Sequence, residues 1–166
     1  MKVLTVANRK GGVGKTTTVV QLALCLAKLK KRVLVIDLDP QGNATQLLVT
    51  KTFIPDDSTI GDVLIGRRSL KDVIIESDLG VTLDVAPASD SIKDVEREID
   101  RYPLRDFLLR KALSDLSYDF VLIDTSPAAD SNLVRNGLVA STHTIIPIEA
   151  ALLSISGYVL ALEDLN

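Results

Sequence analysis

A glycine-rich segment near the N-terminus brings two lysines and two threonines into one short turn. It lies between an apolar run and a stretch with helical periodicity, and it consists of Lys10, Gly11, Gly12, Val13, Gly14, Lys15, Thr16 and Thr17. Glycines allow backbone N–H groups to turn inward and line an anion site that a Cβ would obstruct. The N-terminus of the following helix adds partial positive charge. The segment therefore predicts a phosphate-binding loop, in which Lys15 reaches the β- and γ-phosphates of a nucleotide and the Thr16 hydroxyl binds Mg²⁺.

This segment departs from the usual phosphate-loop pattern at one position. The pattern has its first glycine five residues before Gly14, where this chain has Arg9, and Lys10 directly precedes the paired glycines. The alternative is a glycine-rich turn between a strand and a helix that carries incidental lysines. That alternative does not account for the Lys15–Thr16 pair in this context, so we expect a nucleotide-binding site with Lys10 as a second lysine beside the phosphates.

Two carboxylates follow a second apolar run. Asp37 and Asp39 flank Leu38 at the end of residues 32–37, and in extended geometry they share one face. From there they could hold magnesium-bound water or orient an attacking water. The alternative for each of them is a cap on the next helix, and the sequence leaves it open.

A third carboxylate, Asp124, follows the apolar residues 120–123. An aspartate at the end of such a strand is the usual second magnesium-holding group of phosphate-loop proteins. Apolar strands that end in Asp are common, so the assignment depends on the phosphate loop being present as well. Residues 125–127, Thr-Ser-Pro, are expected to form a loop that senses the γ-phosphate.

Strands and helices alternate along the chain, which predicts an α/β fold with one domain over residues 1–166. We expect a phosphate-loop NTPase-like parallel sheet with helices on both faces and right-handed crossovers. All three motifs then fall at the carboxyl ends of strands, where ligands of such sheets bind. The expected strands are residues 3–7, 32–37, 81–85, 120–124 and 144–148, and the expected helices are residues 16–29, 59–65, 70–75, 91–99, 104–116, 132–140 and 152–166.

Composition excludes several classes of protein. Hydrophobic residues make up 46% and aromatic residues 4%, so the core must be aliphatic, as suits a sheet covered on both faces. A net charge of -3 gives no global sign of a nucleic-acid binder. The single cysteine, Cys25, is expected in the core and rules out an internal disulfide or a Cys-x-x-Cys metal site. Apolar runs are shorter than the ~20 residues of a membrane span, so we expect a cytoplasmic protein without membrane contact.

The motifs together resemble those of the ParA/MinD family of deviant Walker A ATPases, and within it the ParA branch. Residues 10–18 look like the deviant Walker A motif, and residues 37–45, Asp-Leu-Asp-Pro-Gln-Gly-Asn-Ala-Thr, resemble the second ParA signature. Residues 124–127 are similar to the magnesium-binding strand end of the family. Residues 59–64 and 85–88 also fit, so the resemblance spans essentially the whole chain.

This resemblance implies an ATPase that uses ATP and Mg²⁺ as a dimer switch. Lys10 would cross the dimer interface to the partner's nucleotide, while Lys15 and Thr16 act within their own subunit. Asp39 would help to activate the hydrolytic water, with Asp37 and Asp124 supporting the metal. ATP would join a homodimer that binds DNA nonspecifically on the nucleoid. A ParB-type centromere-binding partner would stimulate an otherwise slow hydrolysis.

Two other functions stay open. A MinD-like positioning ATPase needs a C-terminal amphipathic helix, which this sequence does not contain. The other is a nucleotide-binding module without turnover. Members of the family continue well beyond residue 166, so the resemblance implies that this chain lacks the C-terminal part of the family fold, including its last strands and much of the adenine pocket.

Overall fold

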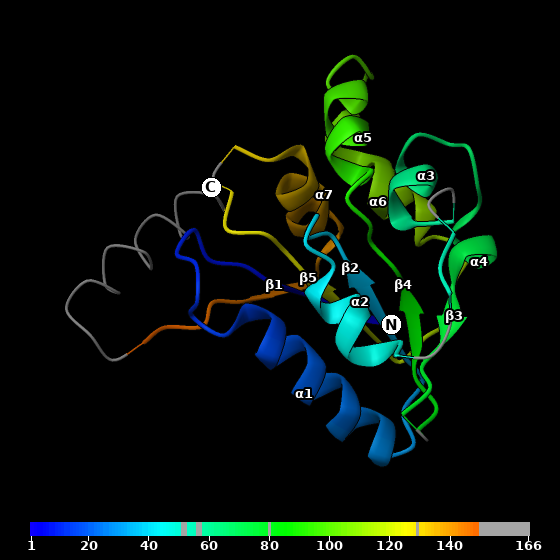
Figure 1. Ribbon diagram of the computed structural model, residues 1–166, viewed down its shortest axis with the longest axis vertical. Helices are drawn as coiled ribbons and strands as arrows, with labels where there is room; N and C mark the ends of the chain where they lie inside the picture. Colours follow the sequence, from blue (N-terminus) through cyan, green and yellow to red (C-terminus); the bar gives the residue numbers. More distant parts are fainter. Residues whose placement is uncertain (51–52, 56–57, 80, 129, 150–166) are drawn as a thin grey trace.

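The computed structural model describes residues 1–50, 53–55, 58–79, 81–128 and 130–149. Within them the chain forms one six-stranded sheet in the order β3-β4-β2-β5-β1-β6 (Figure 1). The strands are β1 (Lys2–Val6), β2 (Val33–Asp37), β3 (Ile75–Glu76), β4 (Asp84–Ala86), β5 (Phe120–Asp124) and β6 (His143–Ile145). The helices are α1 (Lys15–Lys28), α2 (Asn43–Leu48), α3 (Ile60–Leu64), α4 (Leu70–Val73), α5 (Ile92–Ile99), α6 (Leu108–Ala112) and α7 (Asn132–Ala140), with a 3₁₀ turn η1 (Arg105–Phe107) before α6.

Helices cover both faces of this sheet, as predicted. Successive residues of a strand point to opposite faces, so each buried strand supplies both cores. In β2, Val33 and Val35 pack with α1 and α2, while Leu34 and Ile36 pack on the other face with α3 to α7. Figure 1 shows α1 and α2 on one side of the strands and the other helices opposite. The aliphatic runs are therefore buried on both sides, and the predicted fold class is confirmed.

Parallel pairing brings the three motifs to one edge of the sheet. β5 lies between β1 and β2, and all three run in the same direction. In this register Asp124 is opposite Val6 on one side and Asp37 on the other. The end of β1 leads into the glycine-rich loop, so this loop and both strand-end carboxylates lie at the same end of the sheet.

The edge of the sheet differs from the prediction. Residues 70–75 were expected to be a helix, but α4 ends at Val73 and Ile75 begins the short strand β3. A capping box between Ser69 and Asp72 starts the helix, and Ile74 is already extended. β3 pairs antiparallel with β4, so the sheet is not entirely parallel. Two-residue strands are too short to leave a periodic pattern in the sequence.

Four other elements differ from the prediction. The helix expected at 104–116 is a 3₁₀ turn followed by α6, because Leu104 has a positive φ of 57° and turns the chain before the helix starts. α2 was not predicted as an element, β4 begins three residues later than expected, and β6 covers only its first residues. The helix expected at residues 152–166 lies outside the described residues.

Cys25 is exposed, so its expected place in the core was wrong. The buried face of α1 is formed by Val19, Val20, Ala23 and Ala27. Two residues correspond to about 200° around a helix, which turns Cys25 away from Ala23 and toward solvent. In the described part of the chain no helix combines the length and hydropathy needed to cross a bilayer.

Candidate nucleotide-binding site

The glycine-rich loop runs from the end of β1 to the start of α1. Gly12 and Gly14 have φ angles of 74° and 86°, in the left-handed region that strains other residues. A Cβ built on Gly11, Gly12 or Gly14 would meet nothing within 4 Å. Backbone conformation thus requires glycine at positions 12 and 14, and the space in front of all three glycines is open to a ligand.

The start of α1 is suited to an anion. Its N-cap is Gly14, which has no side chain to accept from the first N–H groups, and its first turn contains no acidic residue. Thr18 closes the first turn by donating from its backbone N and its hydroxyl to the Gly14 carbonyl, at 2.9 and 2.7 Å. The preceding N–H groups keep the capacity to bind phosphate oxygens at the positive end of a 14-residue helix.

Lys15 places a largely buried ammonium group in the loop. The residue is only 7% exposed, and its Nζ donates to the Lys10 carbonyl at 3.2 Å. Burial lowers the pKa of Lys15, although the carboxylates of Asp124 and Asp39 act in the opposite direction. A buried cation held by one neutral acceptor favours the approach of an anion such as a phosphate.

Thr16 and Asp124 join the phosphate loop to the end of β5. The Thr16 hydroxyl donates to Asp124 Oδ2 at 2.7 Å. Asp124 is fully buried, and its Oδ1 has no hydrogen-bond partner. Burial raises the pKa of this carboxyl to about 7, with the charges of Asp37 and Asp39 adding to the shift against the Thr16 hydrogen bond. The structure therefore brings Lys15, Thr16 and Asp124 together.

A buried carboxylate oxygen without a donor, next to a hydroxyl, fits a hard cation such as Mg²⁺. Among the described residues, no three or more His, Cys, Asp or Glu side chains form a metal site on their own. A magnesium ion at Thr16 and Asp124 would thus take its other oxygens from phosphate and water, as Mg²⁺ usually does in nucleotide sites.

Asp37 is buried at the end of β2 and holds the start of α2. Its Oδ2 accepts from the Thr45 backbone N and hydroxyl, both at 2.8 Å, and its Oδ1 accepts from the Asp39 backbone N at 3.0 Å. Burial raises the pKa of Asp37 to about 6 against these hydrogen bonds. This geometry matches the capping alternative that the sequence left open, while the metal role of Asp37 stays a prediction.

Asp39 lies in the loop between β2 and α2 and is 8% exposed. Its Oδ1 accepts from the Gln41 backbone N at 2.9 Å, which closes a local turn. The residue lines the same hollow as the phosphate loop. Its role in hydrolysis stays a prediction.

The hollow itself has a volume of about 410 Å³, within the usual range of ligand pockets. Its walls are formed by Gly11, Gly12, Gly14, Lys15, Thr16, Thr17, Asp39, Gln41, Asn43 and Pro127. Pro127 belongs to the predicted loop 125–127, and Gln41 and Asn43 belong to the segment 37–45 that resembles the second ParA signature, although the sequence assigned no individual role to these three residues. Val13 is buried and does not line the hollow, so a contact with the nucleotide through its backbone N–H stays a prediction.

Lys10 stands apart from this hollow. Its Nζ lies 2.6 Å from Glu149 Oε2, and its backbone N donates to Asn8 Oδ1 at 2.9 Å. The Asn8 amide in turn donates to the Pro147 carbonyl at 2.9 Å. The structure thus directs the Lys10 ammonium to the chain after β6 and does not bring it to Lys15.

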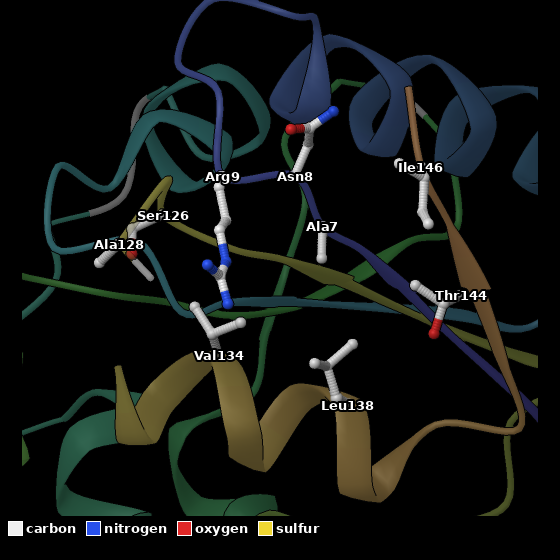
Figure 2. A pocket seen from close by; sticks show the side chains of 9 residues that line it. All are labelled: Ala7, Asn8, Arg9, Ser126, Ala128, Val134, Leu138, Thr144 and Ile146. Carbon is white, nitrogen blue, oxygen red and sulfur yellow. The ribbon is translucent and has the colours of Figure 1, made fainter. Parts of the chain in front are cut away.

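Arg9 replaces the first glycine of the ordinary pattern, and the structure explains why a side chain fits there. Figure 2 shows it extending toward Val134 on α7, beside a separate small cavity of about 10 Å³. Ser126 and Leu138 also line this cavity. The Arg9 side chain points away from the phosphate-facing side of the loop, so it leaves the anion site open.

Together these features define a phosphate-loop NTPase domain, with a glycine-rich loop between β1 and α1, a buried lysine at the helix start and a buried aspartate at the adjacent strand end. The sequence profile of one family, described as an AAA domain, matches residues 1–165. The chain belongs to this family, and its relatives include the chromosome partitioning protein ParA of Caulobacter vibrioides and a plasmid partition protein of Borrelia burgdorferi. The resemblance to the ParA/MinD family is thus confirmed.

Three relatives illustrate the match. The sporulation initiation inhibitor protein Soj of Bacillus subtilis is 37% identical over 159 residues, which cover 94% of this chain and 61% of Soj. A Mycobacterium smegmatis cobyrinic acid a,c-diamide synthase, solved with ADP and magnesium, has a TM-score of 0.91 at 32% identity over 99% of this chain and 66% of its own. A plasmid partition protein of Borrelia burgdorferi has a TM-score of 0.88 at 30% identity, over 99% and 72%. The chain spans about 60% of the length of the curated relatives it matches.

Proposed function

We propose that this chain binds ATP with Mg²⁺ and acts as a ParA-type partition ATPase, a switch that dimerises with ATP and is released by slow hydrolysis. The single observation that carries the proposal is the meeting of Lys15, Thr16 and Asp124 around one glycine-lined hollow, with a buried Asp124 oxygen that accepts no hydrogen bond. The nucleotides in the solved relatives and the partition role of the named relatives support it.

Each residue has a distinct task in this proposal. The loop N–H groups and Lys15 bind the phosphates. Thr16 and Asp124 hold the metal, and Asp37 supports this metal site from the end of β2. Mg²⁺, when bound, neutralises charge on the β- and γ-phosphates. Asp39, which lines the same hollow, orients the attacking water.

Hydrolysis is expected to be slow in the isolated chain. An arginine that contacts the γ-phosphate is worth roughly 10³–10⁵ in rate. Arg9, the arginine next to the loop, points toward α7 and away from the hollow (Figure 2). An activating partner of the ParB centromere-binding type is therefore expected to raise the rate of hydrolysis strongly. DNA bound nonspecifically would localise the dimer to the nucleoid within the cytoplasm.

Dimerisation with ATP is assigned to Lys10. Its ammonium is directed outward from the hollow of its own subunit and is about one-third exposed. In the proposed dimer it contacts the nucleotide of the second subunit, so that ATP joins the two chains and loss of the γ-phosphate separates them.

A thermal-shift measurement with phosphate release tests the proposal. ATP with Mg²⁺ at 100 times its dissociation constant should add about 2.7 kcal/mol of stability. Phosphate release should be slow and should rise when DNA and a ParB-type protein are added. Turnover at about 1–100 s⁻¹ without either of them would contradict a partner-controlled switch.

A nucleotide-binding module without turnover is the second candidate, because the loop, Lys15 and Thr16 can bind a nucleotide without a group that activates water. It predicts the same thermal shift without phosphate release under any of these conditions. Liposome flotation with ATP separates both candidates from a MinD-like regulator, which would float with the vesicles.

A further inference from the structure

Thr45 joins three segments around the nucleotide site. It lies in α2, is 4% exposed, and donates from its hydroxyl to Asp37 Oδ2 at 2.8 Å. The same hydroxyl accepts from the Ala88 backbone N, in the loop after β4, at 3.0 Å. The backbone N of Thr45 donates to the same Asp37 oxygen. One hydroxyl thus uses its donor and an acceptor to connect β2, α2 and the β4–α5 loop.

This connection extends to Asp39. The other oxygen of Asp37 accepts from the Asp39 backbone N, and the Asp39 carbonyl accepts from the Gly42 backbone N at 2.9 Å. Gly42 has a φ of 62°, and a Cβ built on it would lie 3.5 Å from the Ala88 carbonyl oxygen. Residues 39–42 are therefore held between the end of β2 and the β4–α5 loop, on the wall of the hollow that carries Asp39.

We infer that Thr45 is a positioning residue for hydrolysis, which fixes the Asp39 loop against the nucleotide through Asp37 and Ala88. This inference rests on the proposed function. The reason is geometric: without the hydroxyl, Asp37 Oδ2 and the Ala88 N–H each lose a partner, and the loop between them is free to shift. A displacement of about 1 Å at a reacting group can lower the rate about 10²-fold.

The test compares Thr45→Val with Thr45→Ser in the full chain. Valine keeps the shape but not the hydroxyl, whereas serine restores it. Thr59→Val is the matched control, because Thr59 is also buried and donates its hydroxyl to an aspartate, Asp62, at the start of α3 away from the hollow. Amide hydrogen exchange of Asp39, Gln41 and Gly42, the residues of this loop that carry an N–H, is measured without nucleotide, and kcat and KM for ATP are measured on the folded fraction.

We expect Thr45→Val to speed exchange in residues 39–42 at least about tenfold and to lower kcat about 10- to 100-fold, with KM for ATP within about threefold of wild type. Thr45→Ser should recover both, and Thr59→Val should change neither. Unchanged exchange and kcat in Thr45→Val, or a serine variant as impaired as the valine variant, would overturn the inference. A wild-type chain without phosphate release contradicts the proposed function, and the exchange rates then still decide whether Thr45 holds the Asp39 loop.

Discussion

The Lys10 ammonium and the Glu149 carboxylate of the same chain form an ion pair with an Nζ–Oε2 distance of 2.6 Å. Both side chains are partly exposed, at 35% and 48%. Asn8 fixes the neighbouring backbone by accepting from the Lys10 N and donating to the Pro147 carbonyl. A lysine that is to contact the nucleotide of a second subunit must first give up this intrachain pair.

Glu149→Gln should therefore favour the ATP-dependent dimer. Exposed ion pairs typically contribute about 0.2–1 kcal/mol, which corresponds to at most about a fivefold change in an equilibrium. We expect the protein concentration at half-dimerisation with ATP and Mg²⁺ to fall by up to that factor, measured by sedimentation. Glu76→Gln, at an exposed site on β3, is the control and should leave dimerisation unchanged.

Lys10→Ala is the complementary change. It should leave nucleotide binding by the single chain largely intact, because the Lys10 ammonium does not line the hollow. The ATP-dependent dimer should be lost. If sedimentation finds Lys10→Ala dimerising normally with ATP, the role of this lysine across the interface is wrong.

The raised pKa of Asp124 predicts how the free energy of unfolding depends on pH. Its pKa in the folded chain is about 7, against an ordinary value of 3.8. Between these values the folded state binds more protons than the unfolded state, so this group makes stability fall as pH rises from about 4 to 7. Asp124→Asn removes that contribution, which is on the order of a few kcal/mol above pH 7. Urea unfolding of the nucleotide-free variant should give a flatter pH profile and a higher stability at pH 8.

Bound ATP and Mg²⁺ should reverse the higher stability that Asp124→Asn has at pH 8 without nucleotide. A metal needs the ionised carboxylate, so stabilisation by ATP with Mg²⁺ should increase as pH rises through about 7 in the wild-type chain and be largely lost in Asp124→Asn. Asp94→Asn, at an exposed site on α5, is the control for a change of net charge. A wild-type gain from Mg²⁺ that is equal at pH 6 and pH 8 would contradict the assignment of Asp124 to the metal.

Much of this fold could be predicted because the site elements are long and strongly patterned. β2 and β5 are continuous aliphatic runs that end in Asp37 and Asp124, and parallel pairing alone places these carboxylates side by side. The edge was harder, since β3 has two residues and its position depends on pairing with β4 rather than on local sequence. The apolar stretch around Cys25 likewise did not show that this side chain faces solvent.

Side-chain partners were the part of the site that no pattern could supply. The spacing of Asp37 and Asp39 is compatible with metal binding and with capping, and only the three-dimensional position of Thr45 distinguishes the contacts that Asp37 makes. The pairing of Lys10 with Glu149 links residues 139 positions apart, which a local motif does not encode.

Lys15→Ala should abolish measurable binding of ATP. Removing one partner of a buried charged contact typically costs about 2–5 kcal/mol, or at least about 30-fold in affinity. Stability without nucleotide should change little, because burial already disfavours the charged form of Lys15. Lys28→Ala, at the exposed end of the same helix, should bind like the wild type in the thermal-shift measurement. A normal shift in Lys15→Ala would show that the glycine-rich loop does not bind the phosphates.

Asp39→Ala should separate nucleotide binding from hydrolysis. The residue lines the same hollow as the phosphate loop, so its loss removes a group that orients water without removing any loop N–H or Lys15. A positioned acid–base group typically contributes about 10²–10⁴ in rate, and phosphate release should fall by that factor while ATP-dependent dimers persist in sedimentation.

Because Asp39 Oδ1 also accepts from the Gln41 N, Asp39→Asn is the better-matched variant. Its amide oxygen can keep the hydrogen bond of the turn, but the amide carries no charge. Equal loss of hydrolysis in both variants, with intact binding in both, is the expected outcome. An asparagine variant that hydrolyses ATP normally would limit Asp39 to holding the loop.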